Sequence, residues 1–144
     1  MNNVFAFLED AVKFEHEAIE NLLAKIQSSD LDLKISDNHT VRRRLIHMAT
    51  AEYRMANYLY ELPDQEFEVP EDADIEMIRQ SFEISMQRHL KTLENLKETD
   101  LEKNWVSKVS GNTYSYKFLL WHFLEHLATH RGQIAMFIRL ENDK

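Results

Sequence analysis

Glycine and proline are scarce in this chain, and that scarcity limits the folds open to it. Two glycines and two prolines occur among 144 residues. Sheets need many turns, and turns draw on these two residues, whereas the plentiful leucine, glutamate, lysine, alanine and methionine favour long helices. The sequence therefore predicts an all-α protein. A chain of this length fits one domain of ordinary size, so we expect residues 1–144 to form a single domain.

Apolar residues recur at steps of three and four along four segments, and each segment predicts a long helix with one apolar stripe. Four such helices assemble most naturally as a four-helix bundle. The expected helices cover residues 3–27, 39–61, 74–98 and 113–141.

The segments between these helices carry turn and cap signals. SSDLDLKISDN is predicted to be a loop, with Asp37 or Asn38 as the N-cap of the second helix. LPDQEFEVPEDAD holds both prolines and predicts an exposed connection. KNWVSKVSGN predicts an irregular loop or a short extended pair, after which Asn112, Thr113 or Ser115 can cap the last helix.

Three histidines, His122, His126 and His130, recur every four residues near the C-terminus and so share one helical face. His126 and His130 fall within the apolar stripe of the last helix, which directs them toward the core. A buried neutral imidazole needs a partner for each ring nitrogen, and one divalent ion satisfies two rings at once. Two core histidines hydrogen-bonded to other side chains are the alternative interpretation.

A metal held by two histidines of one helix needs a third protein ligand from another helix. The candidates are His47, His16 and Glu15. His47 fits best, because it lies mid-helix beside the small Ala51. Glu15 is expected at the rim of the bundle in a salt bridge, although an acid on that seam can also serve the interior site. His16 is expected at the surface and His89 at the polar rim.

The composition limits which metal ligands and which binding partners the protein can have. No cysteine is present, so any metal must be held by nitrogen and oxygen. The formal net charge of −8 repels phosphate backbones, and the one basic cluster, Arg42, Arg43 and Arg44, is predicted to form a solvated, salt-bridged face rather than a nucleic-acid site. No signal-peptide pattern and no apolar run long enough for a membrane span is present, so we expect a cytoplasmic protein with no membrane partner.

The run HFLEHLATHRGQI resembles the C-terminal signature of the DinB-like family of bacterial helical-bundle metalloproteins, which is related to thiol S-transferases. LIHMATAEYRMANYLYEL is similar to the second helix of that family, and the loop before NTYSYKFLLWH is similar to the connection into its last helix. The resemblance covers nearly the whole chain. It implies an up-down-down-up four-helix bundle and one divalent metal bound by His47, His126 and His130.

The resemblance also assigns supporting residues. His122 matches a family histidine that is not usually a ligand, and we expect it to line the pocket or support the ligands. Gln133 is expected to hydrogen-bond within the site. Glu15 and Tyr58, which the resemblance does not assign, are further pocket candidates from their places on the predicted helices. No catalytic base is assigned. Thr129 stands where the family commonly has a histidine, and this difference is expected to spare the metal while changing pocket polarity or substrate.

Other metal-binding helical patterns do not match. A zinc peptidase helix needs H-E-x-x-H, but Leu127 follows the first ligand here and Glu125 precedes it. The Glu-x-x-His pairs of di-iron bundles and the larger ligand set of hemerythrin-like bundles are not present in order. One metal on three imidazoles is the simpler arrangement.

Three neutral imidazoles leave an ion its full positive charge and an open position, and they suit Zn, Ni, Fe or Co. Such an ion lowers the pKa of a bound water or thiol. The resemblance implies a metal-dependent transferase that activates a low-molecular-weight thiol toward an electrophilic small-molecule substrate, or a related hydrolase or isomerase. The alternative is a non-catalytic, stress-associated metal-binding bundle.

The back of the last predicted helix carries a second apolar stripe, where a soluble monomer would present charge. Small alanines in this stripe would let a symmetry mate approach closely. The sequence therefore predicts a homodimer through the last helix, although the stripe can also pack within its own bundle. The stripe consists of Trp121, Leu124, Ala128 and Ala135.

Overall fold

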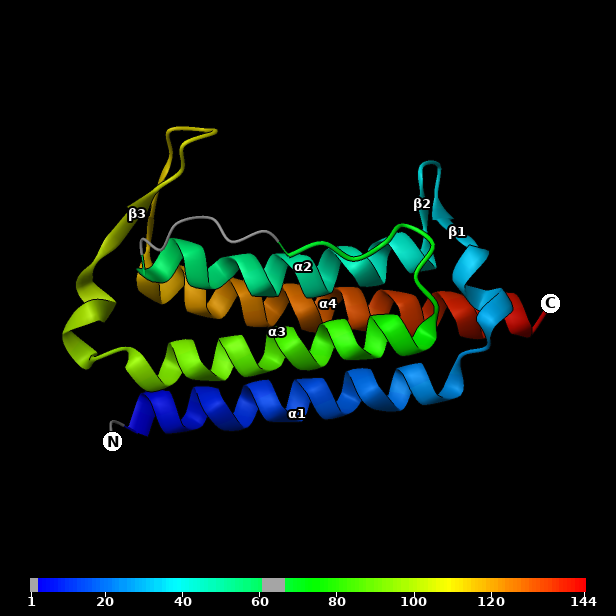
Figure 1. Ribbon diagram of the computed structural model, residues 1–144, viewed down its shortest axis with the longest axis horizontal. Helices are drawn as coiled ribbons and strands as arrows, with labels where there is room; N and C mark the ends of the chain where they lie inside the picture. Colours follow the sequence, from blue (N-terminus) through cyan, green and yellow to red (C-terminus); the bar gives the residue numbers. More distant parts are fainter. Residues whose placement is uncertain (1–2, 61–66) are drawn as a thin grey trace.

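The computed structural model describes residues 3–60 and 67–144, and its main feature is a bundle of four long helices (Figure 1). The first and last helices run in one direction and the middle two in the opposite direction, which is the predicted up-down-down-up order (Figure 1). The all-α prediction is confirmed. The helices are α1 (Asn3–Lys25), α2 (Val41–Tyr60), α3 (Ile75–Asn95) and α4 (Tyr116–Asn142).

The core of the bundle is divided into two apolar clusters. α3 packs against α1 and α2, and α4 packs against the same two helices. One cluster contains Leu23, Leu45 and Ile134, and the other contains Val12 and Leu93. Along the helices, buried polar side chains stand between the two clusters. The members of this polar layer are Glu15, His16, Glu52, Ser85 and His89.

Two short hairpins extend the ends of the bundle on the side of α2 (Figure 1). One follows a 3₁₀ turn at Ser28–Asp32 and pairs β1 (Lys34–Ser36) with β2 (His39–Thr40). The other follows a 3₁₀ turn at Glu98–Glu102 and pairs β3 (Asn104–Val106) with β4 (Thr113–Ser115). The short extended pair predicted before the last helix is therefore confirmed, whereas the first hairpin lies where a loop was predicted.

The N-cap residues of α2 and α4 can be compared with those predicted from the sequence. Ser115 accepts a hydrogen bond from the backbone N–H of Phe118 at 3.1 Å, so one of the three expected caps of the last helix is used. The prediction of Asp37 or Asn38 for α2 is wrong. Thr40 takes that role, with its hydroxyl accepting from the N–H of Arg43 at 3.1 Å, because the hairpin carries the chain two residues further before the helix begins.

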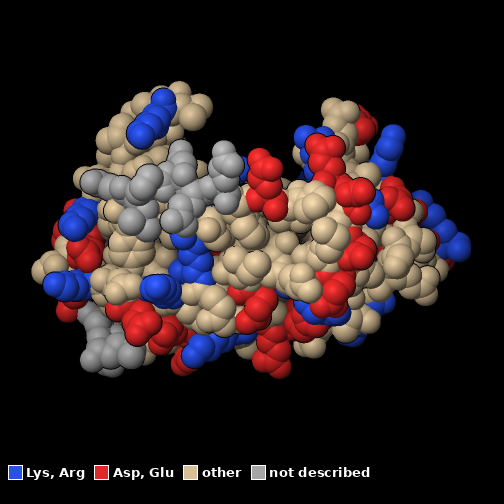
Figure 2. Space-filling model, viewed as in Figure 1, with Lys and Arg blue, Asp and Glu red and all other residues tan. Residues whose placement is uncertain are grey.

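The surface is mixed in charge. Figure 2 shows acidic and basic side chains interspersed over one face of the bundle. Arg42 pairs with Asp32 and donates to the carbonyl of Ala73 at 2.9 Å, so this member of the basic cluster lies in the predicted salt-bridged face. Among the described helices, none has the length and apolar character needed to cross a membrane.

Candidate metal centre

Three imidazoles from two helices meet between α2 and α4. His47 comes from α2, and His126 and His130 come from adjacent turns of α4. One ring nitrogen from each histidine lies within 4.8 Å of the other two. The ring centroids are 5.1 Å apart for His47 and His126, and 4.4 Å apart for His126 and His130. The structure thus brings together the three residues predicted as ligands.

The spacing of the α4 pair fits a shared ion. The Nε2 atoms of His126 and His130 are 3.1 Å apart. Metal–nitrogen bonds of about 2.1 Å to both atoms give a nitrogen–metal–nitrogen angle of about 95°, which is close to the octahedral angle and somewhat below the tetrahedral one. The pair can therefore bind one ion with only small side-chain movements.

Gln133 sets the protonation of one ring. Its Oε1 atom lies 3.0 Å from Nδ1 of His130, and a carboxamide oxygen only accepts hydrogen bonds. With this acceptor His130 carries its proton on Nδ1, which leaves the lone pair of Nε2 directed at His126. Nη1 of Arg44, which lies 3.1 Å from the same Nδ1, then donates to Oε1 of Gln133 and not to the ring. A hydrogen bond of this kind orients a ligand histidine and selects the tautomer that can bind metal.

All three imidazoles favour their neutral form. Burial lowers the pKa of His126 to about 4, with His130 and His47 contributing further. Burial also lowers the pKa of His47, and the charges of His130 and Arg44 act in the same direction. The pKa of His130 is lowered as well, mainly by burial. Near neutral pH the three rings therefore hold lone pairs that are available to an ion.

The centre lies at the rim of the bundle rather than in its core. His47 is exposed, and His126 and His130 are half-buried. The prediction that the α4 histidines point into the core was therefore wrong. Leu127 and Ile134, which are fully buried, occupy the inward face of α4, and the histidines lie beside that face. Solvent and small molecules can reach a centre in this position.

Two other residues near the C-terminal run lie beside the centre. The ring of His122 is 6.2 Å from that of His126, stacks on Phe118 at 5.2 Å and pairs with Glu125 at 3.4 Å. Thr129 donates to Glu125 at 3.2 Å. Neither side chain is part of the three-histidine group, so these two residues can only shape the surroundings of the centre.

Two predicted pocket residues lie elsewhere. Tyr58 packs its ring against Trp105 at 4.5 Å, in the apolar cluster away from the three histidines. Glu15 is 5% exposed and forms an ion pair with Arg131. The expected salt bridge of Glu15 is therefore present, but the residue is buried in the polar layer and not at the rim.

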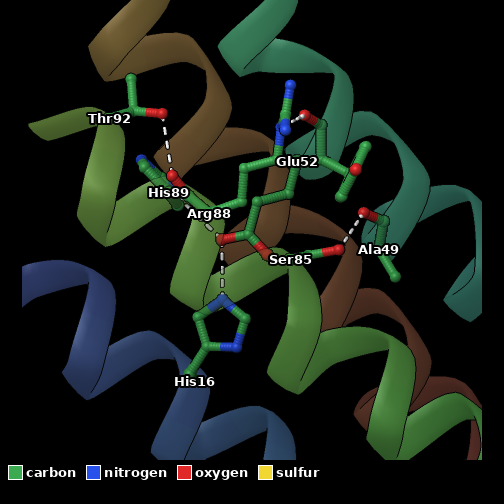
Figure 3. Close-up of polar contacts among 8 residues, drawn as sticks. His16, Ala49, Glu52, Ser85, Arg88, His89 and Thr92 are labelled. Carbon is green, nitrogen blue, oxygen red and sulfur yellow. Dashed lines mark hydrogen bonds and ion pairs between the residues drawn. The ribbon is translucent and has the colours of Figure 1, made fainter. Parts of the chain in front are cut away.

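A second histidine cluster fills the polar layer, and the sequence interpretation missed it (Figure 3). Nε2 of His16 and Nδ1 of His89 lie 2.7 and 2.8 Å from the same carboxylate oxygen, Oε2 of Glu52. His16 is 8% exposed and His89 is 2% exposed, so their assignment to the surface and the polar rim was wrong. Glu52 compensates for their burial, because its carboxylate accepts from a ring on each neighbouring helix.

Two signals for the missed residues were present in the sequence. Glu52 lies four residues after Met48 and three before Met55, which places it inside the apolar stripe of α2. Arg44 lies three residues before His47 and therefore shares its face. In the structure, Nη1 of Arg44 is 3.1 Å from Nδ1 of His130 and 3.2 Å from Oε1 of Gln133. Arg44 thus faces the centre, although a solvated, salt-bridged face was predicted.

The fold and the site together define a class: four-helix bundles with three imidazoles between the second and fourth helices. The chain belongs to the DinB family, whose model matches residues 1–141. No curated protein matches the sequence.

Solved structures support the same fold. A conserved protein from Enterococcus faecalis has a TM-score of 0.78 at 16% identity, covering 100% of this chain and 99% of that one. A DinB-like protein from Bacillus cereus has a TM-score of 0.76 at 18% identity, covering 94% and 91%. A mutant of mycothiol-dependent maleylpyruvate isomerase has a TM-score of 0.71 at 11% identity, and the match covers 90% of this chain but only 60% of that protein.

The contacts of Gln133 and Arg131 predict that mutating the first lowers zinc affinity and that mutating the second lowers stability. Gln133→Ala removes the acceptor that fixes the tautomer of His130, so zinc affinity is expected to fall about tenfold or more. Arg131→Ala removes the partner of Glu15 and is expected to lower thermal stability while changing zinc affinity less. Competition against a chromophoric chelator, combined with thermal denaturation of both variants, measures these effects. The reverse order of zinc affinities would contradict the assigned role of Gln133.

Proposed function

We propose that this protein binds one divalent metal through His47, His126 and His130 and transfers a low-molecular-weight thiol to an electrophilic small molecule. The observation that carries the proposal is a group of three neutral imidazoles, within 4.8 Å of one another, at a position that solvent reaches. A divalent ion held by the three imidazoles would lower the pKa of a thiol bound to it, and the resulting thiolate would attack the electrophile as the leaving group departs. Zn, Ni, Fe and Co all suit an all-nitrogen ligand set.

The protein's own residues have distinct tasks in this proposal. Gln133 holds the proton of His130 on Nδ1, so that Nε2 stays available. Arg44 places a positive charge beside the same ring and favours anionic reactants there. The two apolar clusters keep α2 and α4 in register without involving the centre. The name of the mycothiol-dependent neighbour supports a thiol as one reactant.

The test compares metal-loaded, metal-free and His126→Ala proteins. Each is incubated with an aromatic chloride and one of a panel of small thiols. The remaining thiol is measured over time with a colorimetric thiol reagent. We expect thiol consumption with the loaded protein only. Helical circular dichroism should stay unchanged after chelation, because the bundle has four long helices and two apolar clusters of its own.

If the metal-loaded protein consumed no thiol, the transferase proposal would be contradicted. If chelation then also lowered the thermal stability strongly, a structural metal site would be the better account. The alternative from the sequence, a non-catalytic metal-binding bundle, predicts that pair of results.

We also propose that the protein forms a homodimer through α4. The outer face of α4 leaves Trp121 57% exposed and Ala135 exposed, with Leu124 and Ala128 half-buried between them. Sedimentation equilibrium should give twice the chain mass, and Trp121→Glu should shift the protein toward monomer without changing its metal content. A wild-type protein that stays monomeric at high micromolar concentration would contradict this proposal.

A further inference from the structure

An open groove lies beside His130, and two of its lining side chains contact that ring. Its volume is about 600 Å³, and it runs between β1, the start of α2 and the second half of α4. The two side chains at the histidine end are Arg44 and Gln133, both of which contact His130. The remaining walls are largely apolar and include Ile35, Met136, Phe137 and Leu140.

Arg44 brings an uncompensated positive charge to this groove. Its neighbour Arg42 pairs with Asp32, and Arg43 donates to the backbone carbonyl of Asn38 at 3.0 Å. Arg44, in contrast, has no carboxylate within 4.0 Å among residues 3–60 and 67–144. A half-buried guanidinium is stabilised by an anion.

The donors of Arg44 suit a carboxylate. Within the described part of the chain, only Nη1 of this side chain contacts other polar side chains, donating to Oε1 of Gln133 beside Nδ1 of His130. The Nε and Nη2 groups therefore keep donors for a ligand, and this edge of a guanidinium matches the two oxygens of a carboxylate. The ligand's carboxylate would then lie next to His130, with the rest of the molecule along the apolar walls.

We propose that this groove binds an organic anion with an apolar body and one carboxylate, which Arg44 pairs with beside the histidines. Resting on the proposed function, this inference names the chemical class of the electrophilic substrate. The groove volume of about 600 Å³ is in the range that accommodates drug-sized ligands, so it has room for an apolar body of six or so carbon atoms.

Hexanoate and its neutral analogue hexanamide test the charge recognition. Their affinities for the metal-free protein are measured by NMR titration, so that no ion contributes to binding. We expect hexanoate to bind at least about tenfold more tightly than hexanamide, since one charge-assisted pair contributes about that factor. Arg44→Gln should remove the difference. Arg43→Gln, which removes the same charge one residue away on an exposed side chain, should retain it.

Gly132 offers an independent test of the groove itself. A Cβ atom built on Gly132 has no neighbour within 4 Å, so a side chain there extends into open space without disturbing the packing. Gly132→Leu should weaken hexanoate binding at least about tenfold by occupying the groove. Gly132→Ala is the matched control, and it should change the affinity by less than about threefold.

The outcomes separate this inference from the metal proposal, because zinc content is measured on the same proteins. Equal affinity of hexanoate and hexanamide, or equal losses in Arg44→Gln and Arg43→Gln, would overturn the groove assignment even if zinc is bound. Tight hexanoate binding by a wild-type protein that takes up no zinc would refute the metal proposal and leave the groove assignment standing.

Discussion

Replacing His126 with alanine is expected to lower zinc affinity by at least about two orders of magnitude. The variant keeps His47 on α2 and His130 on α4, but it loses the close pair whose Nε2 atoms are 3.1 Å apart. Two imidazoles on separate helices leave a divalent ion with too few protein ligands for a stable tetrahedral or octahedral site. Zinc titration in competition with a chromophoric chelator gives the affinity, and metal analysis after dialysis gives the occupancy.

His39→Ala and His122→Ala are the matched controls for this prediction. His39 lies on β2, and the His122 side chain is 43% exposed beside Glu125. Each variant removes one imidazole without touching the three that meet, so full occupancy is expected in His39→Ala and at most a small loss in His122→Ala. Full zinc occupancy in His126→Ala or His47→Ala would show that the ligand set is wrong.

The second large effect is expected from Glu52 in the polar layer. Glu52→Ala should lower the free energy of unfolding by about 3 kcal/mol, because two buried imidazole N–H groups lose their shared acceptor and a cavity forms among three helices. Chemical denaturation monitored by circular dichroism measures this loss. A change below about 1 kcal/mol would mean that the cluster does not stabilise the bundle.

Acid should reveal the ionised state of Glu52. Burial opposes its ionisation, but the hydrogen bonds from His16 and His89 outweigh burial and hold the pKa below its ordinary value of 4.5. A lowered pKa means that the stabilisation is fully present above pH 4.5 and is lost as the pH falls through the lower folded value. The stability difference between wild type and Glu52→Gln should therefore be large at pH 7 and shrink below pH 4.5. A difference that stays constant with pH would contradict an ionised Glu52.

The four helices were predictable from apolar periodicity. The predictions that were wrong concern features that depend on tertiary structure. Apolar steps of three and four identify four helices because each helix buries one stripe, and the resemblance supplied their directions. The cap of α2 could not be identified, because β1 and β2 place Thr40, and not Asp37 or Asn38, at the helix start. Strand pairing over so few residues leaves no periodic signal.

The candidate metal site was easier to predict from the sequence than the polar layer was. His126 and His130 share a helix face, so their proximity follows from a spacing of four. The choice of His47 as third ligand rested on its mid-helix position beside the small Ala51, and the resemblance supported it. Glu52, His16 and His89 come from three helices, and nothing local indicates that they meet. A buried histidine is predictable only together with its partner, because burial without a hydrogen bond is costly.

The position of a bound ion tests the three-histidine site most directly. A crystal of the zinc-loaded protein, measured on both sides of the zinc absorption edge, locates the metal by its anomalous scattering. We expect one strong peak per chain, about 2.1 Å from a ring nitrogen of each of His47, His126 and His130. A peak at other residues, or no peak in a crystal grown with excess zinc, would contradict this assignment.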